Sequence, residues 1–518
     1  MRVFNRVAAA KVGRSVFDLS WEKKMSGYLG YLYPMKCEDV VPGDVFKLGS
    51  RHVLRMMPMV APVLHELNLY EHCFFVPYRL LMTKALGDAG DFEDMIIGGA
   101  DGDTDIEIPT WKPTSTIVGS LWDHFGFPIG VDPVGFYPVD FMKRAYNMIY
   151  NEYYEDIEID TPVNITTAED LRSRRWEKDY FTSSRLYQQR GTSPAMPITG
   201  TLAVAPDGAH VYPVYKTTHE TSVAFRGHGD AIPEFNKSVT DDDFVEWDDP
   251  NLQVDLSSAV TFDINDLRHA VQTQKWMERN MRSGVRYTEF LRAHFGVQPR
   301  DDRLDRPEYI GGMKMPIIVS EVLKTSQEAA ADSTDPQGTM YGHGIGVDGK
   351  FYGTYRVKEY GIILSIVSVL PRTLYGQGID RQWIKETLYD FYFPEFANLS
   401  EQPVYRGEIF ANGVEADNKT VFGYQGRFNE MRTRKNVACG KLAPNQAFDY
   451  WTFARYFAAA PSLNATFLSS NGGATAGGIR TDMFAASSAH HFVLSTGNLI
   501  KAVRPLPIES NPGLMDHV

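Results

Sequence analysis

The chain has 518 residues, of which 43% are hydrophobic and 13% aromatic, so it can bury a substantial core. Its formal net charge of −13 is opposite in sign to that of most dedicated nucleic-acid binders. The three cysteines, Cys37, Cys73 and Cys439, lie too far apart for a zinc or redox motif. The most apolar strand-like run, residues 360–371, is too short to cross a bilayer as a helix.

The first 17 residues are predicted to form a basic, irregular arm. Arg2, Arg6, Lys11 and Arg14 precede the first acidic residue, Asp18. A flexible cationic terminus can follow an irregular polyphosphate backbone, so these four side chains are candidate nucleic-acid contacts.

Two strands are predicted next, at residues 44–60 and 63–77. In HELNLYEHCFFVP, residues 65–77, polar and apolar residues alternate, which predicts a strand with one solvent-facing side. Phe74 and Phe75 then run into Pro77, which ends strand pairing. We expect at least one of these two rings to lie in the core.

The rest of the chain alternates between loops, helices and strands. Helical spacing of apolar residues predicts helices at 139–156 and 263–282, and a short one at 288–295. Residues 88–135 and 326–350 read as long loops. Strands are predicted at 355–371 and near 404–410, 420–433 and 490–503. Antiparallel strands at both ends of the chain, with helices and loops inserted between them, favour a jelly roll or a similar sandwich.

Residues 200–255 are the least periodic segment and hold most of the excess negative charge. Between residues 230 and 255 there are nine acidic residues and one lysine, a charge of −8 out of the total of −13. Clustered carboxylates are tolerated cheaply only in water, which predicts a surface position. The acidic residues singled out are Asp230, Asp241, Asp242, Asp243, Glu246, Asp248 and Asp249.

Two stretches mix basic and aromatic residues, at 172–190 and at 427–441. Arginine beside aromatic platforms suits single-stranded nucleic acid. The same residue types are enriched at subunit contacts, so both interpretations stay open here. The candidates are Arg172, Arg174, Arg175, Trp176, Arg432, Arg434 and Lys435.

No pattern argues for catalysis, a metal or a cofactor, and none of these is predicted. GIGVDGKF, residues 344–351, approaches a phosphate-binding loop, but Phe351 stands where a hydroxyl should coordinate magnesium. His490 and His491 are adjacent, so on a strand they point to opposite faces.

Several long stretches, in order along most of the chain, resemble the major capsid proteins of microviruses, especially those of gokushovirus type. They include FDLSWEKKMSGYLGYLYPMKCEDVVPGDVFKL (17–48), RMMPMVAPVLHELNLYEHCFFVPYRLL (55–81), LRSRRWEKDYFTS (171–183) and DFYFPEFANLSEQPV (390–404). INDLRHAVQTQKWMERNMRSGVRYTEFLRAHFGV (264–297) and FGYQGRFNEMR (422–432) continue the match.

The resemblance implies a mainly β fold: an eight-stranded antiparallel jelly roll with long inserted loops and several helices, spanning residues 18–518 as one domain. It also implies a structural coat protein that assembles with itself. About 60 copies would form a T=1 icosahedral shell around circular single-stranded DNA. Residues 200–255 fall where such capsids carry a protrusion at the three-fold axis. Implied partners are the packaged DNA, a pilot protein, a small basic DNA-binding protein and a host surface receptor. Implied locations are the virion and, during assembly, the bacterial host cytoplasm.

Two functions from other classes compete with this interpretation. A carbohydrate-binding jelly-roll protein would need an aromatic platform or a clustered acid pair on a concave face. A cytoplasmic protein that binds single-stranded DNA would bind with strong salt dependence even without assembling.

Overall fold

The structure is a computed structural model that describes residues 13–97, 106–191, 204–206, 214–217, 220–227, 233–235, 245–247, 252–254, 264–283, 305–325, 338–397, 399, 401–486 and 489–508. The chain divides into two compact units, one made of residues 1–188 with 284–518 and the other of residues 189–283. The division of the chain into an arm, a capsid domain and an acidic insertion stays a prediction.

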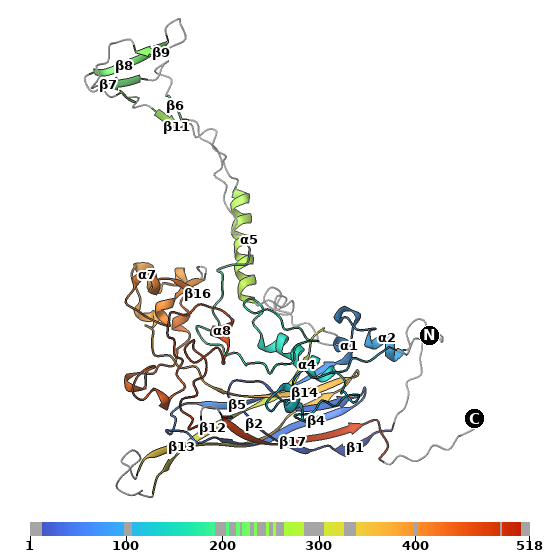
Figure 1. The fold of residues 1–518 in the computed structure, drawn as a ribbon. Coiled ribbons are helices and arrows are strands. Elements are labelled where there is room, and N and C mark those ends of the chain that lie inside the picture. The colour runs from blue at the N-terminus through green and yellow to red at the C-terminus, as the bar shows by residue number, and fades with distance from the viewer. Residues whose placement is uncertain are drawn as a thin grey trace, which may run out of the picture. The chain divides into compact units, whose positions relative to one another are not determined.

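Eight strands of the first unit form the predicted jelly roll (Figure 1). One four-stranded sheet has the order β2–β17–β4–β13, and the other has the order β3–β14–β5–β12. Counted along the chain, these orders are first–eighth–third–sixth and second–seventh–fourth–fifth, the double Greek key of a jelly roll. The bounds are β2 Trp21–Gly27, β3 Tyr33–Val40, β4 Val45–Met56, β5 Leu67–Pro77, β12 Glu308–Leu323, β13 Met340–Arg356, β14 Gly361–Pro371 and β17 Phe492–Arg504.

The strand β12 joins the two sheets at one corner of the barrel. Its first part pairs with β5 in the second sheet, from Glu308 opposite Phe75 to Ile317 opposite Leu67. From Ile318 onward it pairs with β13 of the first sheet. A ninth strand, β1 (Ser15–Asp18), pairs with β17, so the end of the predicted arm is part of the sheet. All pairings in this curled sheet are antiparallel, and the predicted fold class is confirmed.

Both faces of β5 are buried, so the predicted solvent-facing side of this strand is wrong. Alternation directs Phe75 into the barrel, where it clusters with Phe46, Ile363 and Ile500 from both sheets. Phe74 points to the opposite face, yet it is also buried, in a cluster with residues of β14 and of α4 (Phe141–Ile149). Helices inserted far along the chain cover the outer face of the second sheet, as Figure 1 shows for α4 over β14.

The glycine-rich segment 338–350 was expected to be part of a loop, but most of it is the strand β13. Its glycines allow close packing: a Cβ on Gly342 would lie 2.4 Å from the Ala61 carbonyl oxygen, and one on Gly344 would lie 2.5 Å from Met56. Tyr355 and Arg356 end β13 instead of beginning β14. The phosphate-loop-like motif therefore lies inside a strand pair and has no strand–turn–helix context.

Shorter elements fill the connections. The predicted helix at 139–156 is α4 followed by the π-helical turn η3 (Tyr150–Tyr154). The described part of residues 88–135 contains two short helices instead of a continuous loop. The predicted helix at 288–295 lies outside the described residues. The other elements of the first unit are α1 (Tyr78–Leu81), η2 (Lys84–Leu86), α2 (Phe92–Ile97), α3 (Leu121–Phe125), η5 (Arg381–Trp383), η6 (Leu388–Asp390), η7 (Pro394–Phe396), β15 (Gln402–Tyr405), η8 (Arg406–Glu408), α7 (Glu415–Asn418), β16 (Val421–Gln425), η9 (Asn429–Met431), η10 (Gly440–Leu442), η11 (Asp449–Trp451) and α8 (Ala465–Leu468).

The described residues of the second unit form short strands and one long helix. Four strands pair in the order β10–β7–β8–β9, and β11 pairs with β6. The predicted helix at 263–282 is α5 (Ile264–Ser283). The strands are β6 (Val204–Pro206), β7 (Val214–Thr217), β8 (Glu220–Gly227), β9 (Pro233–Phe235), β10 (Val245–Trp247) and β11 (Leu252–Val254).

A charged network lies fully buried between the two sheets of the barrel. Lys36 Nζ on β3 is 2.6 Å from Glu71 Oε1 on β5, and His52 Nε2 on β4 is 2.9 Å from Glu71 Oε2. Because a carboxylate only accepts, His52 Nε2 carries the proton, and Nδ1 faces the Thr496 hydroxyl on β17 at 2.8 Å. The Tyr352 hydroxyl on β13 donates to Glu71 as well. These bonds connect strands of the two sheets across the interior.

Candidate functional site

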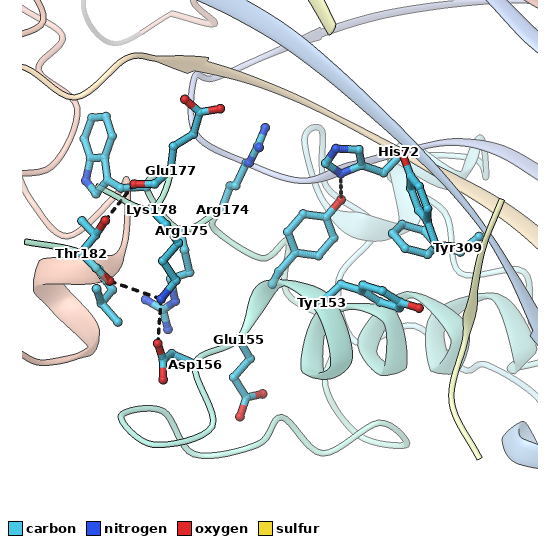
Figure 2. Close-up of a pocket in the computed structure, with 14 residues that line it drawn as sticks. His72, Tyr153, Glu155, Asp156, Arg174, Arg175, Glu177, Lys178, Thr182 and Tyr309 are labelled. Atoms are coloured by element: carbon cyan, nitrogen blue, oxygen red, sulfur yellow. Dashed lines mark hydrogen bonds and ion pairs between the residues drawn. The ribbon is translucent and has the colours of Figure 1, made fainter. Parts of the chain in front are cut away.

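A pocket of about 750 Å³ lies on the outer face of the second sheet (Figure 2). His72 and Phe74 of β5 and Tyr309 of β12 form its floor, because even-numbered residues of β5 face outward. Tyr153 and Tyr154 at the end of the turn η3 border it on one side, with Glu155 and Asp156 after them. The other side is residues 174–178, so the pocket includes Arg174, Arg175 and Trp176 of the first predicted basic and aromatic stretch.

Arg174 is the most buried cation of this pocket, with 8% of its surface exposed. Its guanidinium stacks 4.0 Å from the centre of the Tyr70 ring, and Nη1 donates to Ser368 Oγ at 2.7 Å. No ion pair joins it to a carboxylate of the described residues, and burial lowers its pKa. Its aromatic and hydroxyl partners therefore hold it against the second sheet, inside the subunit.

The neighbours of Arg174 are also engaged within the subunit. Arg175 binds Asp160 Oδ1 through Nη2 at 2.5 Å and the Ala465 carbonyl oxygen through Nη1 at 2.7 Å. Trp176 is 3% exposed and belongs to a core cluster of the barrel, so neither face of its ring is open for stacking on a base. Arg172 is half-buried. These positions favour a packing role for the stretch over direct nucleic-acid contact.

The positive and negative side chains that line the pocket balance each other. Arg174, Arg175 and Lys178 face Glu155, Asp156 and Glu177, and Lys178 pairs with Asp156 at 2.8 Å. Burial, with Arg174 nearby, lowers the pKa of His72 to about 4, so this imidazole is neutral at pH 7. The Tyr154 hydroxyl lies 2.7 Å from His72 Nδ1. Because its charges balance, the pocket is better suited to bind an aromatic or apolar group with polar edges than a phosphate.

The second predicted stretch is more accessible. Arg432 and Arg434 are exposed, and Arg434 Nη1 donates to Gln382 Oε1 at 2.6 Å. Lys435 is half-buried, burial lowers its pKa, and its ammonium donates to the Glu408 carbonyl oxygen at 2.9 Å. This stretch presents two guanidinium groups to solvent beside the aromatic segment 379–393.

Most other predicted site residues lie outside the described residues. Arg2, Arg6 and Lys11 of the arm belong to this group, and Arg14 is exposed at the start of the described chain. Glu246 belongs to β10. Asp230, Asp241, Asp242, Asp243, Asp248 and Asp249 also fall outside the description.

The part of the chain that the structure describes holds neither a metal-binding group of side chains nor a membrane-spanning helix. It contains no group of three or more His, Cys, Asp or Glu side chains placed to hold a metal ion. None of its helices combines the length and apolar character that crossing a bilayer requires.

Comparison with known proteins decides the family. A profile of the family described as capsid protein (F protein) matches residues 5–514. The chain belongs to this capsid protein family. The capsid protein is 30% identical over 502 residues to capsid protein VP1 of Bdellovibrio phage phiMH2K, which covers 90% of each chain. Over 611 residues it is 29% identical to capsid protein VP1 of Chlamydia phage 1, covering 99% of this chain and 97% of that one.

A third relative of the capsid protein is capsid protein VP1 of Spiroplasma virus 4. It is 27% identical over 483 residues, covering 85% of this chain and 84% of the relative. The resemblance predicted from the sequence is confirmed, and the role of a structural capsid protein with it. The comparisons give no support to the carbohydrate-binding or cytoplasmic DNA-binding alternatives.

Proposed function

We propose that this capsid protein self-assembles into a closed T=1 icosahedral shell of about 60 copies around a circular single-stranded DNA genome, with a purely structural role. One observation carries the proposal: all eight strands of the jelly roll are in order within a chain that the capsid family matches from residue 5 to residue 514. The connections between the barrel strands also form a hydrophobic cluster of their own.

Sedimentation of the purified protein tests assembly. We expect a single, homogeneous boundary that sediments much faster than a 58.4 kDa chain would. A stable monomer at high concentration under all conditions, with no particles, would contradict the proposal. A lectin-like protein would sediment as a small species.

The DNA contact in this proposal is assigned to the N-terminal arm. Arg2, Arg6, Lys11 and Arg14 carry charge of the sign that phosphate attracts, and β1 anchors the arm to the edge of the first sheet. The acidic segment 230–255 is assigned to the outer surface, because nine carboxylates facing packaged polyphosphate would repel it. We propose the three-fold protrusion and the host receptor contact for this segment.

Limited proteolysis of intact particles tests this orientation. Cleavage is expected first within residues 230–255, and the arm is expected to survive until the shell is opened. Early cleavage of the arm, with the acidic segment protected, would reverse the assignment.

Substituting the four arm cations with glutamine should leave shells intact and lower their DNA content. Deleting residues 230–255 should spare assembly and packaging, and alter attachment to host cells.

The remaining partners follow from the family resemblance. We propose a pilot protein and a small basic DNA-binding protein as minor components of the virion, with assembly in the cytoplasm of the bacterial host. Mass spectrometry of purified particles tests this: two additional phage-encoded chains are expected, one of them strongly basic.

A further inference from the structure

The outer face of the first sheet carries a row of exposed cations. Alternation along β4 turns Lys47, Arg51 and Arg55 outward, and all three side chains are exposed. Lys47 and Arg55 are eight positions apart in the sequence, about 27 Å along the strand. Only Gly49 and Val53 stand between them on this face, so no large side chain interrupts the row. We call this side of the sheet the cationic face.

The cationic face is open to solvent. Arg51 has a glycine opposite it on both neighbouring strands, Gly349 on β13 and Gly497 on β17. Neither glycine has a side chain that could cover the guanidinium. Figure 1 shows α1, α2 and α4 on the side of β14, whereas β17 and β1 form the opposite side of the barrel, with no described helix over them. Helices of the subunit therefore cover the second sheet, and the described residues leave the first sheet bare.

The charge of this face is opposite in sign to that of the whole chain. The chain contains 52 Lys and Arg against 65 Asp and Glu. A face that only had to be solvated would carry both signs in similar numbers. The outward-facing side chains of β1, β2, β4, β13 and β17 instead include six cations and two acids: Lys24, Lys47, Arg51, Arg55, Arg356 and Lys501 against Asp18 and Glu22.

Both acids lie on edge strands and have cationic neighbours. Glu22 Oε2 is 3.5 Å from Lys24 Nζ, and Glu22 Oε1 accepts a hydrogen bond from the Ser495 hydroxyl at 2.8 Å. Asp18 on β1 lies opposite Lys501 on β17. The two acids therefore face cations near the edges of the sheet, and they do not neutralise the row on β4.

The β4 row has no counter-ion among the described residues. No ion pair or hydrogen bond of those residues engages the side chains of Lys47, Arg51 or Arg55. The Lys47 ammonium lies 4.7 Å from the centre of the Phe351 ring, and Phe351 is 41% exposed. Cations that track a phosphate backbone, beside an aromatic ring on which a base can stack, are the combination that binds single-stranded nucleic acid.

We propose that the cationic face binds the phosphate backbone of the packaged single-stranded DNA. This inference rests on the proposed shell around DNA, and it adds a rigid contact on β4 to the contact of the arm. The arm joins the same sheet, because β1 pairs with β17. Attraction between cations and phosphates does not depend on base sequence. The contact can therefore be repeated in about 60 subunits that each meet a different part of one genome.

Glutamine substitutions in the row test the contact. The row variant is Lys47→Gln/Arg51→Gln/Arg55→Gln. The matched control, Lys112→Gln/Lys385→Gln/Lys441→Gln, loses the same charge at other exposed positions. All six positions are exposed, so both variants should keep the thermal unfolding midpoint of the parent chain. Fluorescence anisotropy measures the binding of each purified chain to a labelled thymidine oligonucleotide between about 50 and 200 mM salt.

The row variant should bind the oligonucleotide roughly 100-fold more weakly than the parent chain at about 0.1 M salt. The slope of log affinity against log salt should be smaller by about 2, since each phosphate contact on a single strand contributes about 0.7. The control should bind as the parent chain does. Particles of the row variant should also hold less DNA per shell than particles of the control, as measured by ultraviolet absorbance.

Unchanged affinity, salt slope and DNA content in the row variant would overturn the proposal and leave the shell itself standing. A row variant that forms no shells but binds the oligonucleotide normally would also overturn it, because the face would then contact a neighbouring subunit. An equal loss of binding in the control would show that total charge matters and not this face. Arg51→Lys/Arg55→Lys keeps both charges and should keep the salt slope; a loss of binding there would contradict a contact made by charge. Shells of the unsubstituted chain that contain no DNA would instead count against the proposed function.

Discussion

Replacing Glu71 with glutamine should severely destabilise the capsid subunit. The substitution removes the anion from a site where Lys36 and Glu71 have no solvent exposure and their charged atoms lie 2.6 Å apart. At an effective dielectric constant of about 20, attraction at that distance is roughly 6 kcal/mol, against which both desolvation penalties act. Removing the charge of Glu71 leaves the Lys36 ammonium buried without a counter-ion. We therefore expect the free energy of unfolding to fall by about 3–5 kcal/mol.

The double variant Lys36→Met/Glu71→Leu is the matched control. It removes both charges, so it should recover most of the loss, apart from about 1–3 kcal/mol for the donor on His52 Nε2 that loses its acceptor. Chemical denaturation of the dissociated subunit, followed by circular dichroism, measures both variants. A change below about 1 kcal/mol for Glu71→Gln, or a double variant less stable than the single one, would refute a buried charged network.

The same network predicts the acid response. Burial alone would raise the pKa of Glu71, but the Lys36 ammonium and His52 outweigh it and hold this pKa well below its ordinary value of 4.5. The stabilisation is therefore complete above about pH 4.5 and is lost as the pH falls toward the lower pKa of the folded state. The stability of the double variant should decline less than that of the parent chain between pH 5 and pH 3.

Four further substitutions have defined outcomes. Phe74→Ala and Phe75→Ala should each cost roughly 3–5 kcal/mol and abolish particle yield, since the rings occupy two different cores; unchanged yield and thermal stability in both would contradict the burial of β5. Burial raises the pKa of Glu408 to about 7, so its protonated form stabilises the fold at low pH and this contribution disappears as the pH rises through 7. The unfolding temperature of Glu408→Gln should therefore gain on that of the parent chain between pH 5 and pH 8, and a constant difference would refute this assignment. Arg174→Met should leave the DNA content of particles unchanged, because the guanidinium lies against Tyr70 inside the subunit; reduced packaging would make it a DNA contact.

The sequence predicted strand positions best where alternation or continuous apolar character was strong. The strands at β4, β5 and β17 were expected within about four residues, as was the helix of α4 and η3, whereas β14 begins at Gly361 and not at residue 355 as predicted. The second buried face of β5 could not be predicted, because the helix that covers it follows more than sixty residues later. β13 was missed because its glycines resemble a loop; their role, close approach to the Ala61 backbone and to Met56, depends on tertiary neighbours.

The functional surfaces were predictable only in part. Both basic and aromatic stretches could be found by composition, but composition did not distinguish the buried Trp176 from the exposed Arg434. One overlooked signal was present in HELNLYEHCFFVP: Glu71 has the same strand parity as Leu67, Leu69 and Phe75, which marks it as an inward-facing acid. Its partners, Lys36 and His52, come from other strands, and sequence spacing does not reveal that they meet.

Electron microscopy of the purified protein, with averaging of the particles, tests the central claim most directly. Uniform closed shells with icosahedral symmetry are expected, with about 60 jelly-roll subunits and density for nucleic acid inside. Isolated subunits or open, irregular aggregates under every assembly condition would contradict the account.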